Sequence, residues 1–185
     1  VTQQRNNTCG YATAGMLLGY LEGSNIDEAY LYENEPFDER GITFIRLLEI
    51  YKKYLKGYAA SLIHEDKDGT LAIIKQSLQE GLPLQIMHLT ENALGNNEPI
   101  QHYAVLTGYD EAKGIFTLAD TYGFYKEMGE ADFFDAISFR NDCLPDFIKR
   151  SMPSKAMIRF SRRHDCCKKE ATKQEQKNTI DPFCF

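Results

Sequence analysis

The chain has 185 residues, of which 43% are hydrophobic and 26% charged, and its formal net charge at pH 7 is −6. This composition is typical of one globular domain with a sizeable core, and no apolar run approaches the roughly 20 residues that a membrane-spanning helix needs. Residues 161–185 carry six Lys/Arg and four Asp/Glu, which leaves 15 basic and 23 acidic residues in the body of the chain. An acidic body argues against a nucleic-acid partner.

The first predicted helix spans Cys9–Leu21, and the turn sequence Gly23-Ser24-Asn25 ends it. Gly15 and Gly19 are four residues apart and therefore lie on one face of this helix. Because glycine weakens a helix by about 1 kcal/mol relative to alanine, two of them on one face indicate a buried helix pressed closely against another element.

A second helix is predicted from Thr43, near its N-cap, to Leu55, with an apolar side formed by Ile45, Leu48, Tyr51 and Leu55. The other predicted elements follow from periodicity and turn residues. They are a strand over Tyr58–Ile63, a helix over Thr70–Gln79, strands over Leu82–Leu89, Gln101–Tyr109 and Ile115–Ala119, a helix over Glu130–Phe139 and a strand over Ala156–Phe160.

Helices come first along this chain and most of the strands later, which argues for an α+β fold. The turn Asp110–Gly114 predicts that the strands on either side of it form an antiparallel hairpin. We expect one domain over residues 1–160 and a polar, flexible tail over 161–185, where the sequence is lysine-rich and lacks periodicity.

Cys9 lies where a loop becomes a helix, a position at which the helix dipole and unpaired N–H groups favour a thiolate. Gly10 follows and is expected to leave room for a substrate at the sulfur. Gln3 precedes Cys9 by six residues, and its side-chain N–H, together with the Cys9 backbone N–H, would form an oxyanion hole. Gln4 is the alternative donor.

His102 opens one strand of the predicted hairpin and Asp120 ends the other, with arms of similar length on either side of the turn. The two side chains should therefore lie near each other across the ladder. The carboxylate could then hold one imidazole nitrogen and leave the other facing the cysteine. His88 is the main alternative to His102 as base. Asp110 is the next candidate, after Asp120, for the residue that orients the histidine.

Other residues in the chain have simpler interpretations. His64 beside Glu65 and Asp66 is interpreted as part of a surface turn, and Tyr122 and Phe124, just past Asp120, are the aromatics expected to touch substrate. His164, Cys166 and Cys167 lack the ligand spacing of a zinc site, so no metal site is expected there.

The segments QQRNNTCGYATAGMLL and QHYAVLTGYDEAKGIFTLAD resemble the C39-peptidase-like branch of the papain-like cysteine peptidases. The resemblance implies a papain-like fold, in which the nucleophile helix packs on an antiparallel sheet. It also implies amide-bond chemistry that needs no cofactor. Its motifs imply Cys9 as nucleophile, His102 as base, Asp120 as the orienting residue and Gln3 as oxyanion donor.

Two positions differ from the bacteriocin-processing members of that family: Thr8 stands where Asp is usual, and Thr121 where Pro commonly follows the aspartate. We therefore expect a free-standing, bacterial, effector-like cysteine peptidase that acts on a protein or peptide substrate. The alternatives are a protein-glutamine deamidase or acyl transferase with the same triad, or an inactive binding module with the same fold.

No signal peptide is visible, although the chain starts at Val1 rather than Met, which is compatible with removal of a leader. The five cysteines are an odd number without regular spacing, which suits free thiols in a reducing compartment. We expect a monomer that is cytoplasmic or secreted into a host cell and has no membrane partner.

Overall fold

A six-stranded antiparallel sheet forms the centre of the part of the chain that the computed structural model describes, which comprises residues 3–5, 7–36, 41–90, 100–138 and 155–163. The strand order is β1-β6-β2-β3-β4-β5. The strands are β1 (Tyr58–Ile63), β2 (Leu84–Thr90), β3 (Ile100–Asp110), β4 (Ile115–Asp120), β5 (Tyr125–Gly129) and β6 (Met157–Arg162). The helices are α1 (Cys9–Glu22), α2 (Glu28–Asn34), α3 (Phe44–Tyr54), α4 (Lys67–Gln79) and α5 (Glu130–Ile137).

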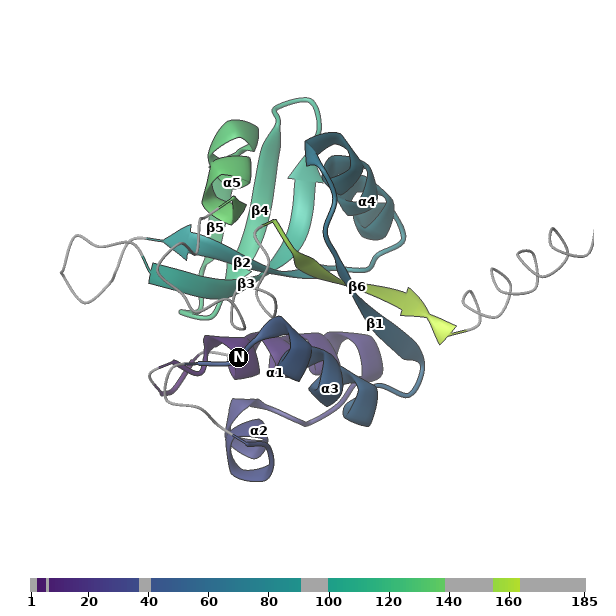
Figure 1. Ribbon diagram of the computed structural model, residues 1–185, viewed down its shortest axis with the longest axis vertical. Coiled ribbons are helices and arrows are strands. Elements are labelled where there is room, and N and C mark those ends of the chain that lie inside the picture. Colours follow the sequence, from purple (N-terminus) through teal and green to yellow (C-terminus); the bar gives the residue numbers. More distant parts are fainter. Residues whose placement is uncertain (1–2, 6, 37–40, 91–99, 139–154, 164–185) are drawn as a thin grey trace, which may run out of the picture.

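Helices cover both faces of this sheet (Figure 1). On one face α1 and α3 share a buried apolar cluster with the sheet, to which Tyr103 and Val105 of β3 belong. On the other face α4 and α5 form a second cluster that includes Ala104 and Leu106 of the same strand. Successive side chains of a strand point to opposite faces, so β3 is apolar throughout its middle because both of its faces are buried.

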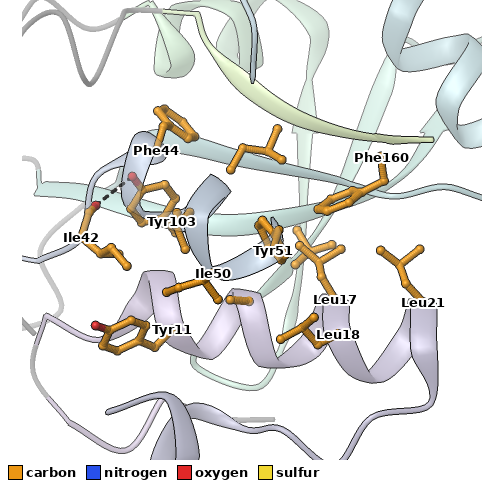
Figure 2. Packing of buried hydrophobic residues seen from close by; sticks show 14 of the residues in the cluster. Tyr11, Leu17, Leu18, Leu21, Ile42, Phe44, Ile50, Tyr51, Tyr103 and Phe160 are labelled. Carbon is orange, nitrogen blue, oxygen red and sulfur yellow. Dashed lines mark hydrogen bonds between the residues drawn. The ribbon is translucent and has the colours of Figure 1, made fainter. Parts of the chain in front are cut away.

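Helix α1 approaches its neighbours so closely that two positions require glycine. A Cβ on Gly10 would collide with the side chain of Ile42 and crowd the ring of Tyr103, and a Cβ on Gly15 would lie 3.1 Å from the backbone of Asp27 at the start of α2. Figure 2 shows Tyr103 beside Ile42, whose carbonyl accepts a 2.9 Å hydrogen bond from the tyrosine hydroxyl. The prediction of a tightly packed helix is confirmed at Gly15, whereas Gly10 makes room for the core rather than for a substrate.

Most predicted elements are present, with shifted ends. Helix α4 begins at Lys67 rather than Thr70, because the carboxylate of Asp66 caps it by accepting from the Gly69 N–H at 2.8 Å. Two short elements, α2 and β5, were not predicted. β5 is an exposed edge strand with little apolar alternation, so its existence depends on the ladder with β4.

The buried side of α3 differs from the prediction. Phe44, Leu47 and Ile50 are buried together with Tyr51, whereas Ile45 is 49% exposed. The capping of the helix by Thr43, which accepts from the Arg46 N–H, is as predicted. At the other end of the chain β6 continues to Arg162, two residues past the predicted domain boundary. The rest of the predicted tail, from residue 164, lies outside the described residues.

Candidate active site

Cys9 is the first residue of α1, and its thiol is free and partly exposed. Thr8, at the N-cap, makes no capping hydrogen bond with its side chain, and the first turn contains no acidic residue. By contrast, Asp27, Thr43 and Asp66 each accept a backbone N–H at the start of their helices. The N-terminus of a helix favours negative charge, so the uncapped first turn of α1 can stabilise a thiolate.

A buried chain of hydrogen bonds holds the backbone of this first turn. The hydroxyl of Thr13 lies 3.0 Å from the carbonyl oxygens of both Cys9 and Gly10, which share its single hydrogen. It accepts from the side-chain amide of Gln85 on β2, whose own oxygen accepts from the Tyr51 hydroxyl at 2.7 Å. Cys9 is thereby tied to the sheet through its backbone, by Thr13 and Gln85, which the sequence analysis did not single out, and by Tyr51.

The segment before Cys9 is held by Glu28, a carboxylate that is 1% exposed on α2. Its oxygens accept from the backbone N–H of Gln4 at 2.7 Å, from the N–H of Arg5 at 3.2 Å and from the Thr8 hydroxyl. Buried carboxylates need such partners, because an unpaired buried charge is costly. Glu28 therefore holds the segment that leads into Cys9, although nothing in its sequence context indicates this.

His102 and Asp120 lie together across the β3–β4 ladder, in which Ala104 is paired with Asp120. The two side chains are 2% and 4% exposed. Nε2 of His102 is 3.2 Å from Oδ1 of Asp120, and the same oxygen accepts from the backbone N–H of Tyr122 at 2.9 Å. The hairpin register thus brings together the two residues that sequence reasoning paired.

The charges of the pair reinforce one another. Burial favours the neutral form of His102, but its hydrogen bonds with Asp120 and with Cys9 outweigh burial and raise the pKa of the imidazole to about 9. Burial likewise disfavours charge on Asp120, but hydrogen bonds from His102 and from the Tyr122 N–H hold the pKa of the carboxyl below its ordinary value. Since Nε2 faces the carboxylate, Nδ1 is the nitrogen left for the Cys9 sulfur.

Thr121 connects this pair to Gln3. Its hydroxyl is 3.0 Å from Nε2 of His102 and 3.1 Å from Oε1 of Gln3. The backbone N–H of Gln3 also donates to the Thr121 carbonyl at 2.6 Å. Gln4, the alternative oxyanion donor, is exposed, and its backbone N–H is bound by Glu28. Of the two glutamines, Gln3 is therefore the one in contact with the histidine cluster.

Two rings flank the imidazole of His102. The exposed ring of Tyr122 stacks on it, with centroids 5.0 Å apart and planes within 2° of parallel, and Phe124 continues the stack. His88 pairs directly with His102 in the β2–β3 ladder and meets it edge-on at 5.9 Å. Burial, and then the charge on His102, lower the pKa of His88 to about 4. Its Nε2 has no hydrogen-bond partner.

A largely apolar hollow of about 350 Å³ lies farther along α1, between that helix and the sheet. Met16 and Tyr20 line it from the helix, on the side of α1 that also carries Cys9. The other lining residues are Leu17, Leu78, Gly81, Pro83, Val105, Thr107, Ala119 and Tyr125. The rise of a helix places Met16 about 10 Å beyond Cys9.

The remaining sequence candidates lie elsewhere. Asp110 is at the far end of the hairpin, where it forms a 3.0 Å ion pair with Lys113. His164, Cys166 and Cys167 lie outside the described residues, as do Cys143 and Cys184. Within the described ranges no cluster of His, Cys, Asp and Glu is arranged to hold a metal ion. None of the helices described there is long and apolar enough to cross a membrane.

Comparisons with known proteins show the family of this chain and a similar fold. The family model described as "Peptidase_C39 like family" matches residues 1–138. One similar structure is the crystal structure of a double glycine motif protease from an AMS/PCAT transporter in complex with the leader peptide, with a TM-score of 0.55 and 16% identity over 88% of this chain and 89% of that one.

A second similar structure is the N-terminal peptidase C39-like domain of the toxin secretion ATP-binding protein from Vibrio parahaemolyticus. Its TM-score is 0.49 and its identity 8%, over 87% of this chain and all of that one. A comparison with curated protein sequences gives no match. At 16% identity the likeness to the double glycine motif protease concerns the fold alone, which is the α+β arrangement expected from the sequence.

Proposed function

The chain belongs to the Peptidase C39-like family, and from this premise we propose that it is a cysteine peptidase that hydrolyses peptide bonds through Cys9, His102 and Asp120. The observation that carries the proposal is that one buried imidazole, His102, is hydrogen-bonded to both the thiol and the carboxylate. This is the arrangement of base and orienting group that activates a nucleophile.

In the proposed reaction the Cys9 thiolate attacks the carbonyl carbon of the scissile bond. The carbonyl oxygen becomes an oxyanion, which accepts hydrogen bonds from the Cys9 backbone N–H and from the Gln3 side-chain N–H. The intermediate collapses as His102 gives the proton on its Nδ1 to the leaving amine. The product amine departs, and an acyl thioester on Cys9 remains.

Hydrolysis of the thioester reverses the role of the imidazole. His102 takes a proton from a water molecule, the resulting hydroxide attacks the thioester carbonyl, and a second oxyanion forms at the same place. Collapse releases the carboxylic acid and restores the thiolate. Throughout both steps Asp120 keeps Nε2 protonated and the ring oriented, because its carboxylate stays ionised at neutral pH.

A peptide substrate also fits the surroundings of Cys9. An extended peptide advances about 3.3 Å per residue, so a peptide that ran along α1 from Cys9 would bring a side chain about three residues from the scissile bond to the apolar hollow beside Met16. The protease of similar fold was crystallised with a leader peptide, which supports a peptide as the class of substrate. The free-standing, effector-like role remains a prediction from the sequence.

The first test is the rate at which iodoacetamide alkylates Cys9, read by peptide mass spectrometry in the native protein and in His102→Ala. If the thiolate–imidazolium pair exists, Cys9 of the native protein reacts faster at neutral pH than the other four cysteines do in the unfolded chain. This advantage should disappear in His102→Ala. Equal rates in the two proteins would exclude the proposed pair.

A second experiment identifies the reaction. The protein and a Cys9→Ala control are each incubated with a peptide library, and the products are read by mass spectrometry. A peptidase generates new termini that the control lacks. A glutamine deamidase leaves the peptides whole and converts an amide to an acid, an outcome that would replace the peptidase proposal with the deamidase.

A further inference from the structure

Thr121 contacts both the candidate base and the candidate oxyanion donor. Its side chain is 0% exposed, and its single hydroxyl lies 3.0 Å from Nε2 of His102 and 3.1 Å from Oε1 of Gln3. Gln3 and Thr121 are 118 positions apart in the sequence. A second, independent bond joins them, since the backbone N–H of Gln3 donates to the Thr121 carbonyl at 2.6 Å.

The direction of each hydrogen bond follows from its neighbours. The amide nitrogen of Gln3 donates to the carbonyl of Arg5 at 2.6 Å, so the amide oxygen faces Thr121 and must accept the hydroxyl hydrogen. A hydroxyl has one hydrogen to give. Toward His102 it can therefore only accept, from the Nε2–H that also faces Asp120.

The reverse arrangement is unfavourable at both ends. A hydroxyl that donated to His102 would need an unprotonated Nε2, which would then face the ionised Asp120 carboxylate across 3.2 Å. The hydroxyl oxygen would also face the Gln3 oxygen without a hydrogen between them. A rotated Gln3 amide would place its oxygen against the Arg5 carbonyl instead. One arrangement satisfies every group: Nε2–H of His102 donates to the Thr121 hydroxyl, and this hydroxyl donates to Oε1 of Gln3.

We propose that Thr121 is a positioning residue that couples the catalytic imidazole to the oxyanion hole, because its hydroxyl fixes which end of the Gln3 amide faces the substrate. This inference rests on the proposed function, in which His102 is the base and Gln3 the oxyanion donor. With the amide oxygen held by Thr121, the amide nitrogen is the end that remains to donate to an oxyanion.

The chain of bonds also persists through the reaction. The proton that His102 exchanges with thiol, amine and water is the one on Nδ1, whereas the proton on Nε2 stays between Asp120 and Thr121. The Thr121 hydroxyl therefore keeps the same direction during acylation and deacylation. The oxyanion hole is thus oriented in the same way for both intermediates, with no reorganisation between them.

The test compares a reagent that needs an oxyanion hole with one that does not. A peptide aldehyde adds to a cysteine thiolate to give a tetrahedral hemithioacetal, whose oxygen occupies the oxyanion position, whereas iodoacetamide alkylates sulfur without forming such an oxygen. In Thr121→Val, which keeps the branched shape and the backbone bond, aldehyde affinity should fall by at least about tenfold, as expected for a weakened oxyanion donor. The alkylation rate should fall far less.

Three variants control this comparison. Thr121→Ser retains the hydroxyl and should restore aldehyde affinity. Thr70→Val removes another buried threonine hydroxyl, on α4, that donates to the Glu65 carbonyl, and should leave affinity unchanged. The double variant Gln3→Ala/Thr121→Val should bind no more weakly than Gln3→Ala alone, because Thr121 acts through Gln3. Additive losses in the double variant would overturn the proposal.

A spectroscopic measurement decides the question without catalysis. In ¹⁵N-labelled protein, the side-chain resonances of both His102 Nε2 and Gln3 Nε2 should shift in Thr121→Val and return in Thr121→Ser. If the Gln3 resonance does not move, the coupling does not exist, whatever the activity. The proposed function fails separately, when His102→Ala leaves the alkylation of Cys9 unchanged.

Discussion

His88 and His102 face each other directly across the β2–β3 ladder, yet at neutral pH their surroundings keep His88 neutral and His102 positively charged. The pKa of His88 is lowered to about 4, mainly by burial, and that of His102 is raised to about 9 against its own burial, by Asp120 and Cys9. Only one of the two imidazoles, His102, has a carboxylate partner, and that difference is the reason for proposing His102 rather than His88 as the base.

The stability of the fold should therefore be greatest near pH 6.5, the ordinary pKa of both histidines. Between pH 4 and 6.5 the unfolded chain binds a proton at His88 that the folded protein does not, so acid destabilises the fold. The stabilisation from His102 is complete below pH 6.5 and is lost as pH rises through about 9. The stability that Asp120 contributes is lost only near and below its ordinary pKa of 3.8, so this residue adds to the acid destabilisation only there.

Urea unfolding between pH 4 and 9.5 measures this profile. His88→Gln should reduce the loss of stability toward acid and leave the alkaline side unchanged. His102→Gln should abolish the loss toward alkali and should also reduce the acid loss in part, because the charge on His102 helps to lower the pKa of His88. If the free energy of unfolding of His88→Gln still falls as steeply between pH 6.5 and 4, another group titrates in that range.

Asp120→Asn should lower kcat/KM by as much as about 10⁴, because an amide cannot keep Nε2 protonated and the ring correctly oriented. The pKa of His102 should fall at the same time, since the carboxylate is one of the groups that raise it. Both effects can be followed, by steady-state kinetics and by NMR titration of the imidazole. Asp110→Asn is the matched control, because Asp110 forms its ion pair with Lys113 at the far end of the hairpin. An equal loss of kcat/KM in Asp110→Asn would show that Asp120 is not the residue that orients His102.

Glu28→Gln should reduce both stability and activity. The substitution replaces one of the two carboxylate oxygens that accept from the N–H groups of Gln4 and Arg5. A donor that loses its partner away from water costs about 1–3 kcal/mol. We expect faster hydrogen exchange at these two amides and a lower midpoint of urea unfolding. Glu33→Gln, an exposed position on the same helix, should behave like the unsubstituted protein. Unchanged exchange at Gln4 and Arg5 would mean that α2 does not hold the loop.

Gly10→Ala and Gly19→Ala should have opposite effects on stability although they lie on one helix. A Cβ at Gly10 meets Ile42 and Tyr103, so we expect a loss of about 1–3 kcal/mol from overpacking. A Cβ at Gly19 has only the Ser24 carbonyl at 3.5 Å, so alanine there should be neutral or stabilise by up to about 1 kcal/mol. The free energy of unfolding in urea tests both. Similar values for the two variants would contradict the packing of α1.

Local features of the sequence were sufficient to predict most of the elements. Helix caps such as Thr43 and the turn between β3 and β4 involve residues close together in the chain, so their chemistry is visible in the sequence. The pairing of His102 with Asp120 belongs to this class, because a hairpin fixes its register through its turn. Helix α2 and strand β5 were missed because both are short, and β5 has little apolar alternation of its own.

What the sequence by itself determined is the hairpin that carries His102 and Asp120, and the helix that begins at Cys9. Only the tertiary structure decided that β6 lies between β1 and β2, that Glu28 holds the loop before the nucleophile, and that Thr121 touches Gln3. These contacts join segments far apart in the chain, and their geometry depends on how sheet and helices pack. Periodicity and turn chemistry describe a few neighbouring residues at a time and contain no information about such contacts.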